Sequence, residues 1–273
     1  MRVAIIGGTG VLDPGLLKDI CEHVISTPYG DAAVKTGTYG EEEVAFIARH
    51  GWTHSIPPHK VNYRANISAL KQIGVTRIIA TSAVGSLNPD MKPGDCVVLD
   101  QFIDFTKARA STFFDGGDGG VVHTDFTEPY CKEIRACLIK AGQDLGIPTH
   151  VRGTYVATEG PRFETAAEIR MFRLLGGDVV GMTNVPECVL AREAGICYAA
   201  VAVVTNFAAG ISSRPLSHQE VVEVMHENSE RLRKIIARTI ETLPARPGCD
   251  CPGIAQEATA TPQEATAARS REA

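Results

Sequence analysis

Short apolar runs alternate along this chain with segments whose apolar residues recur every three to four positions. Several runs are continuously apolar and rich in valine and isoleucine, which is typical of strands buried on both faces of a sheet. Strands are predicted over residues 3–6, 44–48, 77–80, 96–102, 153–158, 178–182 and 198–205.

The segments between these runs carry the periodicity of amphipathic helices. One helix is predicted after Lys60 and ends at Gly74, a second spans residues 165–175, and Pro186 opens another as a first-turn proline. The clearest helix begins at Ser217, three residues before Glu220, which is the spacing of a capping box. The alternation predicts an α/β fold, a single domain with a central mixed, mostly parallel sheet flanked by helices.

The composition changes at Pro244. Residues 244–273 contain a single aliphatic side chain larger than alanine, Ile254, and otherwise consist mainly of Ala, Thr, Glu, Pro, Gln and Arg. Such a segment buries too little apolar surface to offset the entropy of ordering it. We therefore expect a folded domain over residues 1–243 and a flexible, low-complexity tail over residues 244–273.

Composition excludes several classes of protein. With 44% apolar and 22% charged residues, the chain of 273 residues is globular, and its net charge of −5 gives no footprint for nucleic acid or an anionic membrane. The longest apolar runs, such as residues 198–204, are far shorter than a membrane helix requires. The N-terminal sequence becomes glycine-rich before a secretory apolar region develops, so a cytoplasmic location is expected.

The eight cysteines form no C-x-x-C pair, and most lie singly in apolar segments. Buried thiols in a reducing compartment are the simplest interpretation. Cys249 and Cys251 are the exception, because their C-x-C spacing is compatible with a redox or disulfide role as well as with two inert thiols. The sequence leaves these alternatives open.

Glycines, hydroxyls and cationic side chains follow four of the predicted strands. Residues 7–10 are Gly-Gly-Thr-Gly, Arg49 and His50 follow the second strand, residues 81–86 follow the third, and Thr183 follows a later one. Backbone N–H groups, hydroxyls and a guanidinium fork are the groups that bind phosphate. Their position at the carboxyl ends of buried strands predicts a phosphate-binding crevice.

Two other ligands are less consistent with these loops. A dinucleotide fingerprint would need a third glycine where Asp13 stands. The spacing of His50 and His54 resembles a zinc motif on a helix, but Gly51 and the strand exit argue against a helix there.

Longer motifs carry a resemblance to a known family. They are IIGGTG, ARHGxxHxxxxxxVNYRANI, TSAVGSL, PGDxVxxDQFIDFT, ATEGPRFET, DVVGMTNVPE and LAREAGICYA. In this order, over residues 1–243, they resemble the trimeric purine nucleoside phosphorylase / methylthioadenosine phosphorylase family, and its methylthioadenosine branch most closely. The resemblance implies the nucleoside-phosphorylase fold and phosphorolysis, in which inorganic phosphate attacks C1′ of a purine nucleoside and releases the base and a sugar 1-phosphate.

The resemblance also implies roles for individual residues. Phosphate would be held by Thr9, Arg49, His50, Ser82, Ala83 and Thr183, and the nucleoside would lie against Phe163, Met182, Asn206, Phe207 and Ala208. Catalysis would rest on Asn206, Arg49 and His50. The family needs no metal and no organic cofactor, only phosphate as co-substrate, and it forms trimers or dimers of trimers. His123 matches the position that reaches into the neighbouring subunit's pocket.

Three departures from methylthioadenosine members indicate a different nucleoside. Glu164 replaces a small residue, Asn206 and Ala208 replace aspartates, and His218 replaces an apolar residue. A carboxylate can accept from N1–H of a 6-oxopurine, an amide can donate to O6 and serve N7, and an imidazole can bind a 5′-hydroxyl. The sequence therefore predicts a 6-oxopurine nucleoside phosphorylase of purine salvage that acts on inosine and guanosine.

Other interpretations remain open at this point. A helix start for Glu164, an Asx turn for Asn206 and a solvated face for His218 would be purely structural roles. S-methyl-5′-thioinosine phosphorylase would share the first two residues but would favour an apolar side chain at position 218, and methylthioadenosine phosphorylase is the other branch activity. This chain lacks the third glycine that an NAD-dependent protein would have, and it lacks the N-terminal aspartate cluster of a calcium-dependent nucleoside hydrolase.

Overall fold

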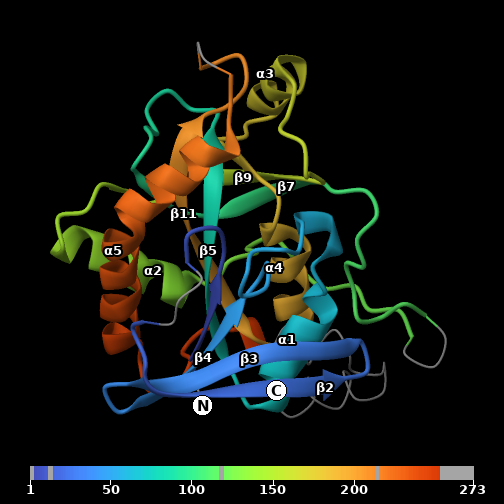
Figure 1. Cartoon of the computed structure of the whole chain (residues 1–273). Helices are drawn as coiled ribbons and strands as arrows, with labels where there is room; N and C mark the ends of the chain where they lie inside the picture. Colours follow the sequence, from blue (N-terminus) through green and yellow to red (C-terminus); the bar gives the residue numbers. More distant parts are fainter. Residues whose placement is uncertain (1–2, 12–14, 117–119, 213–214, 253–273) are drawn as a thin grey trace, which may run out of the picture.

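The computed structural model describes residues 3–11, 15–116, 120–212 and 215–252 (Figure 1). Its strands are β1 (Val3–Gly7), β2 (Lys18–Thr27), β3 (Gly30–Tyr39), β4 (Glu42–Ala48), β5 (Arg77–Ser86), β6 (Cys96–Val98), β7 (Gln101–Phe105), β8 (Thr149–His150), β9 (Thr154–Thr158), β10 (Val179–Gly181) and β11 (Cys197–Phe207). Its helices are the 3-10 turn η1 (Pro58–Lys60) and α1 (Tyr63–Gln72), α2 (Lys132–Asp144), α3 (Ala166–Leu174), α4 (Asn184–Glu193) and α5 (His218–Thr242). No helix in these described ranges is long and apolar enough to cross a membrane.

The described strands form one sheet. Its main path runs β2-β3-β4-β1-β5-β10-β9-β7, while β11 pairs with β5 and β6, and β8 pairs with β6. β1 is parallel to β4 and β5, and β11 is parallel to β5, whereas β10 is antiparallel to β5. The predicted α/β fold with a mixed, mostly parallel sheet is confirmed.

Helices cover both faces of this sheet, with α1 and α4 on one side and α2 and α5 on the other (Figure 1). Successive side chains of a strand point to opposite faces. Accordingly, Ile6 of β1 packs in a core with Leu190 of α4, and its neighbour Ile5 packs in a second core with Ile236 of α5. Burial on both faces explains why the central strands are continuous apolar runs in the sequence.

β5 changes its partner along one edge, and this change positions the candidate site. β1 pairs with β5 as far as Ala80, and β10 pairs with it from Gly85 onward, while β11 follows the opposite edge. Among the described strands, none pairs with residues 81–84 along the first edge, so the backbone groups there are available to partners other than a neighbouring strand. Ligands of α/β proteins bind at such places, where neighbouring strands diverge at their carboxyl ends.

Some elements differ from the prediction. β2 and β3 form an antiparallel hairpin that the pattern missed, because the side chains of β2 are almost all exposed and no apolar run marks it. α2 was also missed, although Ile134, Leu138 and Ala141 form its buried face at helical spacing. The predicted strand 96–102 is divided into β6, which pairs with β11, and β7, which pairs with β9.

Residues 244–252 lie against the domain. The Pro244 carbonyl accepts a hydrogen bond from Arg77 at 2.9 Å, and the Gly248 N–H donates to Glu133 at 2.8 Å. Residues 253–273, most of the predicted tail, lie outside the described residues. The domain boundary at residue 243 therefore stays a prediction.

Candidate active site

A cavity of about 390 Å³ lies where β1, β4, β5, β10 and β11 end. Its volume is typical of a site for a small molecule. The predicted residues that line it are Thr9, Arg49, His50, Ser82, Ala83, Phe163, Glu164, Met182, Thr183, Asn206, Ala208 and His218. Residues from distant parts of the sequence meet here because the carboxyl ends of neighbouring parallel strands lie at one edge of the sheet.

Arg49 is fully buried and forms a two-pronged ion pair with Glu187 of α4. Its Nε donates to Glu187 Oε2 at 2.6 Å and its Nη2 to Oε1 at 2.7 Å. Burial lowers the pKa of Arg49, but the Glu187 carboxylate more than compensates and the net shift is upward, so the guanidinium keeps its charge. Glu187 was not predicted from the sequence.

Arg49 keeps donors for a ligand despite this pair. A guanidinium has five N–H groups. Two bind Glu187 and one on Nη1 binds the Thr81 carbonyl at 2.9 Å, which leaves one N–H on each terminal nitrogen. A Cβ atom at Gly8 would lie 2.8 Å from Nη1, so the glycine is required for this close approach of loop and guanidinium.

The open edge of β5 supplies further donors. The Thr81 carbonyl faces this edge, since it accepts from Arg49 there. Backbone groups of a strand alternate between its two edges, so the N–H of Ala83, two residues on, faces the same side. The Ser82 hydroxyl accepts from Asn184 at 3.0 Å, and Asn184 accepts in turn from Tyr130 at 3.1 Å. These buried bonds fix the hydroxyl at the cavity wall.

His50 is held as a neutral imidazole. Its Nδ1 lies 2.8 Å from the Ile56 carbonyl, so the proton is on Nδ1 and Nε2 is free to accept. Burial and, next, the charge of Arg49 lower the pKa of His50 to about 4. His50 therefore offers phosphate an acceptor for a P–O–H group, and is not the cationic side chain that its place beside Arg49 in the sequence indicates.

The titration of His50 makes stability depend on pH. In the unfolded chain its pKa is near 6.5, and in the folded chain it is about 4, so the unfolded state binds the proton more readily between these values. The contribution of neutral His50 to the free energy of unfolding is therefore fully present above pH 6.5 and is lost as the pH falls toward 4. Between pH 8 and pH 5 we expect the free energy of unfolding to decrease by about 2 kcal/mol more in the wild type than in His50→Gln. Urea unfolding at both pH values measures this, and equal decreases in the two proteins would contradict it.

Two further histidines, His54 and His218, line the cavity beside His50. The rings of His50 and His54 are 4.7 Å apart, and those of His54 and His218 are 5.8 Å apart. His54 Nε2 lies 3.0 Å from the Thr9 hydroxyl. His218 is exposed at the start of α5, where its ring borders the cavity.

Asn206 and Glu164 add an amide and a carboxyl group to the cavity lining. Asn206 follows a bulge in β11; its Oδ1 accepts from Thr205 Oγ1 at 2.8 Å, and its Nδ2 donates to the Phe207 carbonyl at 3.0 Å. One N–H of this amide therefore remains for a ligand. Glu164 Oε1 accepts from the Thr158 hydroxyl at 2.7 Å, and burial raises the pKa of this carboxyl group.

Arg109 joins two loops of the cavity wall and was not predicted. Its Nη1 donates to the carbonyls of Met182 and Val185, and its Nη2 donates to those of Thr158 and Glu159. The carbonyl of Met182 is thereby engaged, so this residue offers a ligand its side chain and its remaining backbone. No pattern in the sequence signals a cation whose partners are carbonyl oxygens.

Two predicted residues lie outside the cavity. Side chains alternate along a strand, so Asn206 and Ala208 face the cavity and Phe207 does not line it. His123 is exposed on the single chain, away from the cavity lining. Its reach into a neighbouring subunit stays a prediction, since the structure contains one chain.

The fold and the cavity define a member of the phosphorylase superfamily, whose family model matches residues 2–241. The chain is 59% identical to the 6-oxopurine nucleoside phosphorylase of Pyrococcus furiosus, with 94% of this chain and 99% of the relative covered. It is 49% identical to the S-methyl-5′-thioadenosine phosphorylase of Hyperthermus butylicus, covering 91% and 92%. The methylthioadenosine phosphorylase of Schistosoma mansoni in complex with adenine superposes with a TM-score of 0.90 at 34% identity, covering 94% and 98%.

This chain belongs to the family of purine nucleoside and methylthioadenosine phosphorylases, as its motifs predict. It is a nucleoside phosphorylase, a pentosyltransferase.

Proposed function

We propose that this protein is a 6-oxopurine nucleoside phosphorylase, which converts inosine and guanosine reversibly into the free base and ribose 1-phosphate. The observation that carries the proposal is the pairing of Glu164 with Asn206 in the same cavity as the anion-binding groups around Arg49. The name of the Pyrococcus furiosus relative supports it.

The anion-binding end of the cavity suits phosphate. The residues that bear the two remaining N–H groups of Arg49, the Ala83 amide and the hydroxyls of Thr9, Ser82 and Thr183 all line this cavity, and His50 can accept from a protonated phosphate oxygen. Positioned donors in a site that excludes water hold a dianion and align it for attack. A phosphate oxygen bonds to C1′ as the C1′–N9 bond breaks and its electron pair moves to the purine. The bound anion offsets the positive charge that develops on the ribose.

The base-binding end suits an oxygen at C6. Asn206 has an N–H free to donate to O6 or N7, and Glu164 can accept from N1–H and from the 2-amino group of guanine. In adenine, N1 is an acceptor and would leave the carboxylate without a partner. Met182 would lie beside the ribose, and Phe163, which is partly exposed, would cover the purine.

The proposal extends to features beyond the single chain. No metal or organic cofactor takes part in the reaction, trimers or dimers of trimers form, and His123 completes the neighbour's pocket at the 5′ end of the nucleoside. Purine salvage in the cytoplasm is the setting. Size determination of the protein in solution, and loss of activity in His123→Ala without loss of assembly, test the intersubunit role.

Steady-state phosphorolysis of four nucleosides tests the activity. Inosine is expected to have a higher kcat/KM than adenosine, methylthioinosine or methylthioadenosine, and omission of phosphate should abolish base release. Methylthioadenosine as the best substrate would overturn the proposal. Methylthioinosine as the best substrate would favour the alternative enzyme, which uses the same base contacts, and release of ribose without phosphate would indicate a hydrolase.

His218 is expected to select the 5′ group of the nucleoside. One hydrogen bond to a 5′-hydroxyl contributes about 1 kcal/mol, so His218→Val should shift the ratio of kcat/KM for methylthioinosine over inosine upward by about fivefold. His226→Val is the matched control, since His226 is exposed on the same helix and does not line the cavity. An unchanged ratio in His218→Val would remove His218 from substrate selection.

A further inference from the structure

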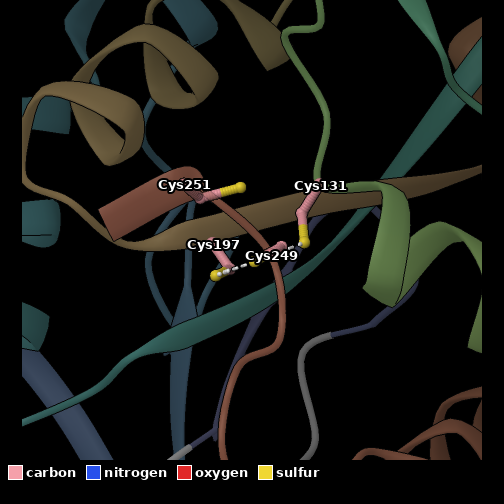
Figure 2. A group of neighbouring side chains, drawn as sticks. All are labelled: Cys131, Cys197, Cys249 and Cys251. Atoms are coloured by element: carbon pink, nitrogen blue, oxygen red, sulfur yellow. Dashed lines mark hydrogen bonds between the residues drawn. The ribbon is translucent and has the colours of Figure 1, made fainter. Parts of the chain in front are cut away.

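Four cysteines from three distant parts of the sequence meet outside the active site. Cys131 precedes α2, Cys197 begins β11, and Cys249 and Cys251 come from the packed segment 244–252 (Figure 2). The Cys249 sulfur lies 3.3 Å from that of Cys197 and 3.6 Å from that of Cys131. All four Sγ atoms lie within 4.8 Å of one another, and three of the residues are buried.

We propose that these four cysteines bind one structural zinc ion as thiolates. Four thiolates at about 2.3 Å from a tetrahedral zinc ion are separated from one another by about 3.8 Å. The observed sulfur separations lie around this value and well above the ~2.05 Å of a disulfide. Four sulfur ligands favour zinc over magnesium or calcium, which prefer oxygen.

The surroundings offset the negative charge of such a site. Cys131 occupies the N-cap position of α2, where the helix dipole favours negative charge, and its thiol makes no capping hydrogen bond. Arg192 is buried, and its Nη1 donates to the Cys251 sulfur at 3.7 Å. A positive group that binds a ligand sulfur is a typical neighbour of a thiolate metal site.

Few apolar side chains hold residues 244–252 against the domain. This stretch contains only proline, alanine and cysteine as apolar residues, so hydrophobic burial contributes little to its order. A metal ion would join this stretch to the ends of α2 and β11. It would thereby close a loop of the chain between Cys197 and Cys249, which reduces the entropy of the unfolded state. A cavity lined by Asp125, Lys132 and Asp250 reaches the cysteines and provides a path for the ion.

The zinc site is separate from phosphorolysis. Cys197 begins β11 and Asn206 lies near its other end, nine residues and about 30 Å along the strand. The ion therefore stabilises the fold without touching the substrate. This inference departs from the expectation, drawn from the sequence, that the chain holds no metal, and it replaces both the redox and the inert interpretation of Cys249 and Cys251.

Elemental analysis of the purified full-length protein tests the site. We expect one zinc ion per chain in the wild type and in the control Cys21→Ser, whose cysteine is exposed and distant, and a loss of at least tenfold in Cys249→Ser/Cys251→Ser. Cobalt substituted into the wild type should give the intense visible bands of a tetrahedral thiolate complex. The double variant should keep kcat for inosine but unfold on the order of 10 °C lower.

Chelation provides a second measurement that needs no variant. Zinc released from the wild type by a chelator in denaturant should equal the number of chains, and four additional thiols per chain should then react with a thiol reagent. Metal-free protein whose mass shows two disulfides would overturn the proposal. It would also be overturned by metal-free protein with free thiols, by iron in place of zinc, or by zinc that the double variant retains.

Discussion

Replacing Asn206 by alanine is expected to lower kcat/KM for inosine by about 10²–10³-fold, since loss of one preorganised donor in an active site has this effect. The Asn206 amide has one N–H left for the leaving purine after its bond to the Phe207 carbonyl. As the glycosidic bond breaks, electrons move toward N7 and O6, so the hydrogen bond from Asn206 stabilises the transition state more than it stabilises the bound nucleoside. KM should change less than kcat.

Asn206→Asp should change the choice of base as well as the rate. A carboxylate accepts from the 6-amino group of adenosine but faces the O6 acceptor of inosine, so the inosine-to-adenosine ratio of kcat/KM should fall by about 100-fold. Asn206→Ala removes a donor that can serve N7 in both bases, so the ratio should change less than in Asn206→Asp.

Asn88→Ala is the control for these variants. Asn88 donates to Asp178 at 3.1 Å and does not line the cavity, so its loss should leave both substrates unaffected. Steady-state assays with both nucleosides measure all three variants. An inosine rate unchanged in Asn206→Ala would show that this amide does not bind the base.

The fold could be predicted from the sequence to the extent that it depends on burial. Central strands such as β1 and β11 are buried on both faces and therefore stand out as apolar runs. The hairpin of β2 and β3 could not be found in this way, because β2 is held by backbone pairing with β3 while its side chains remain exposed. α2 does carry a signal in the sequence, because its buried residues recur at helical spacing, but no continuous apolar run marks it.

Some residues of the candidate site could likewise be predicted from the sequence, and others could not. Residues that follow a strand directly, such as Arg49 and Thr183, could be predicted because parallel strands bring their carboxyl ends together. Partners that depend on tertiary packing could not: Glu187 is separated from Arg49 by 138 residues and lies within a helix that is buried on most sides. Likewise, no spacing in the sequence indicates that the C-x-C pair lies beside Cys131 and Cys197 in the fold.

Glu187→Gln is expected to lower the free energy of unfolding by about 3–5 kcal/mol, which is the usual effect of removing one partner from a buried ion pair. Both side chains are essentially inaccessible to solvent, so water cannot replace the lost carboxylate. Glu187 also accepts from Tyr198 at 2.8 Å, and this bond would be weakened too. Urea unfolding in phosphate-free buffer measures the change.

The same substitution should reduce activity, because Glu187 fixes the orientation in which Arg49 presents its two remaining N–H groups. We expect KM for phosphate to rise at least tenfold. Saturating phosphate should restore part of the lost stability, since the bound anion then compensates the guanidinium charge, but at equal phosphate concentration it should stabilise the variant less than the wild type, because the variant binds the anion more weakly.

Two comparisons separate the ion pair from a general effect of the substitution. Glu193→Gln, on the same helix, removes a carboxylate that accepts from Thr112 and from the Phe113 N–H, and it should lower stability by only about 1–2 kcal/mol. Arg49→Met/Glu187→Leu removes both charges and should be more stable than Glu187→Gln while remaining inactive, because an apolar pair carries no uncompensated charge. If the double variant were instead as unstable as the sum of the two single variants Arg49→Met and Glu187→Leu, the two side chains would not be coupled, and the orienting role of Glu187 would be excluded.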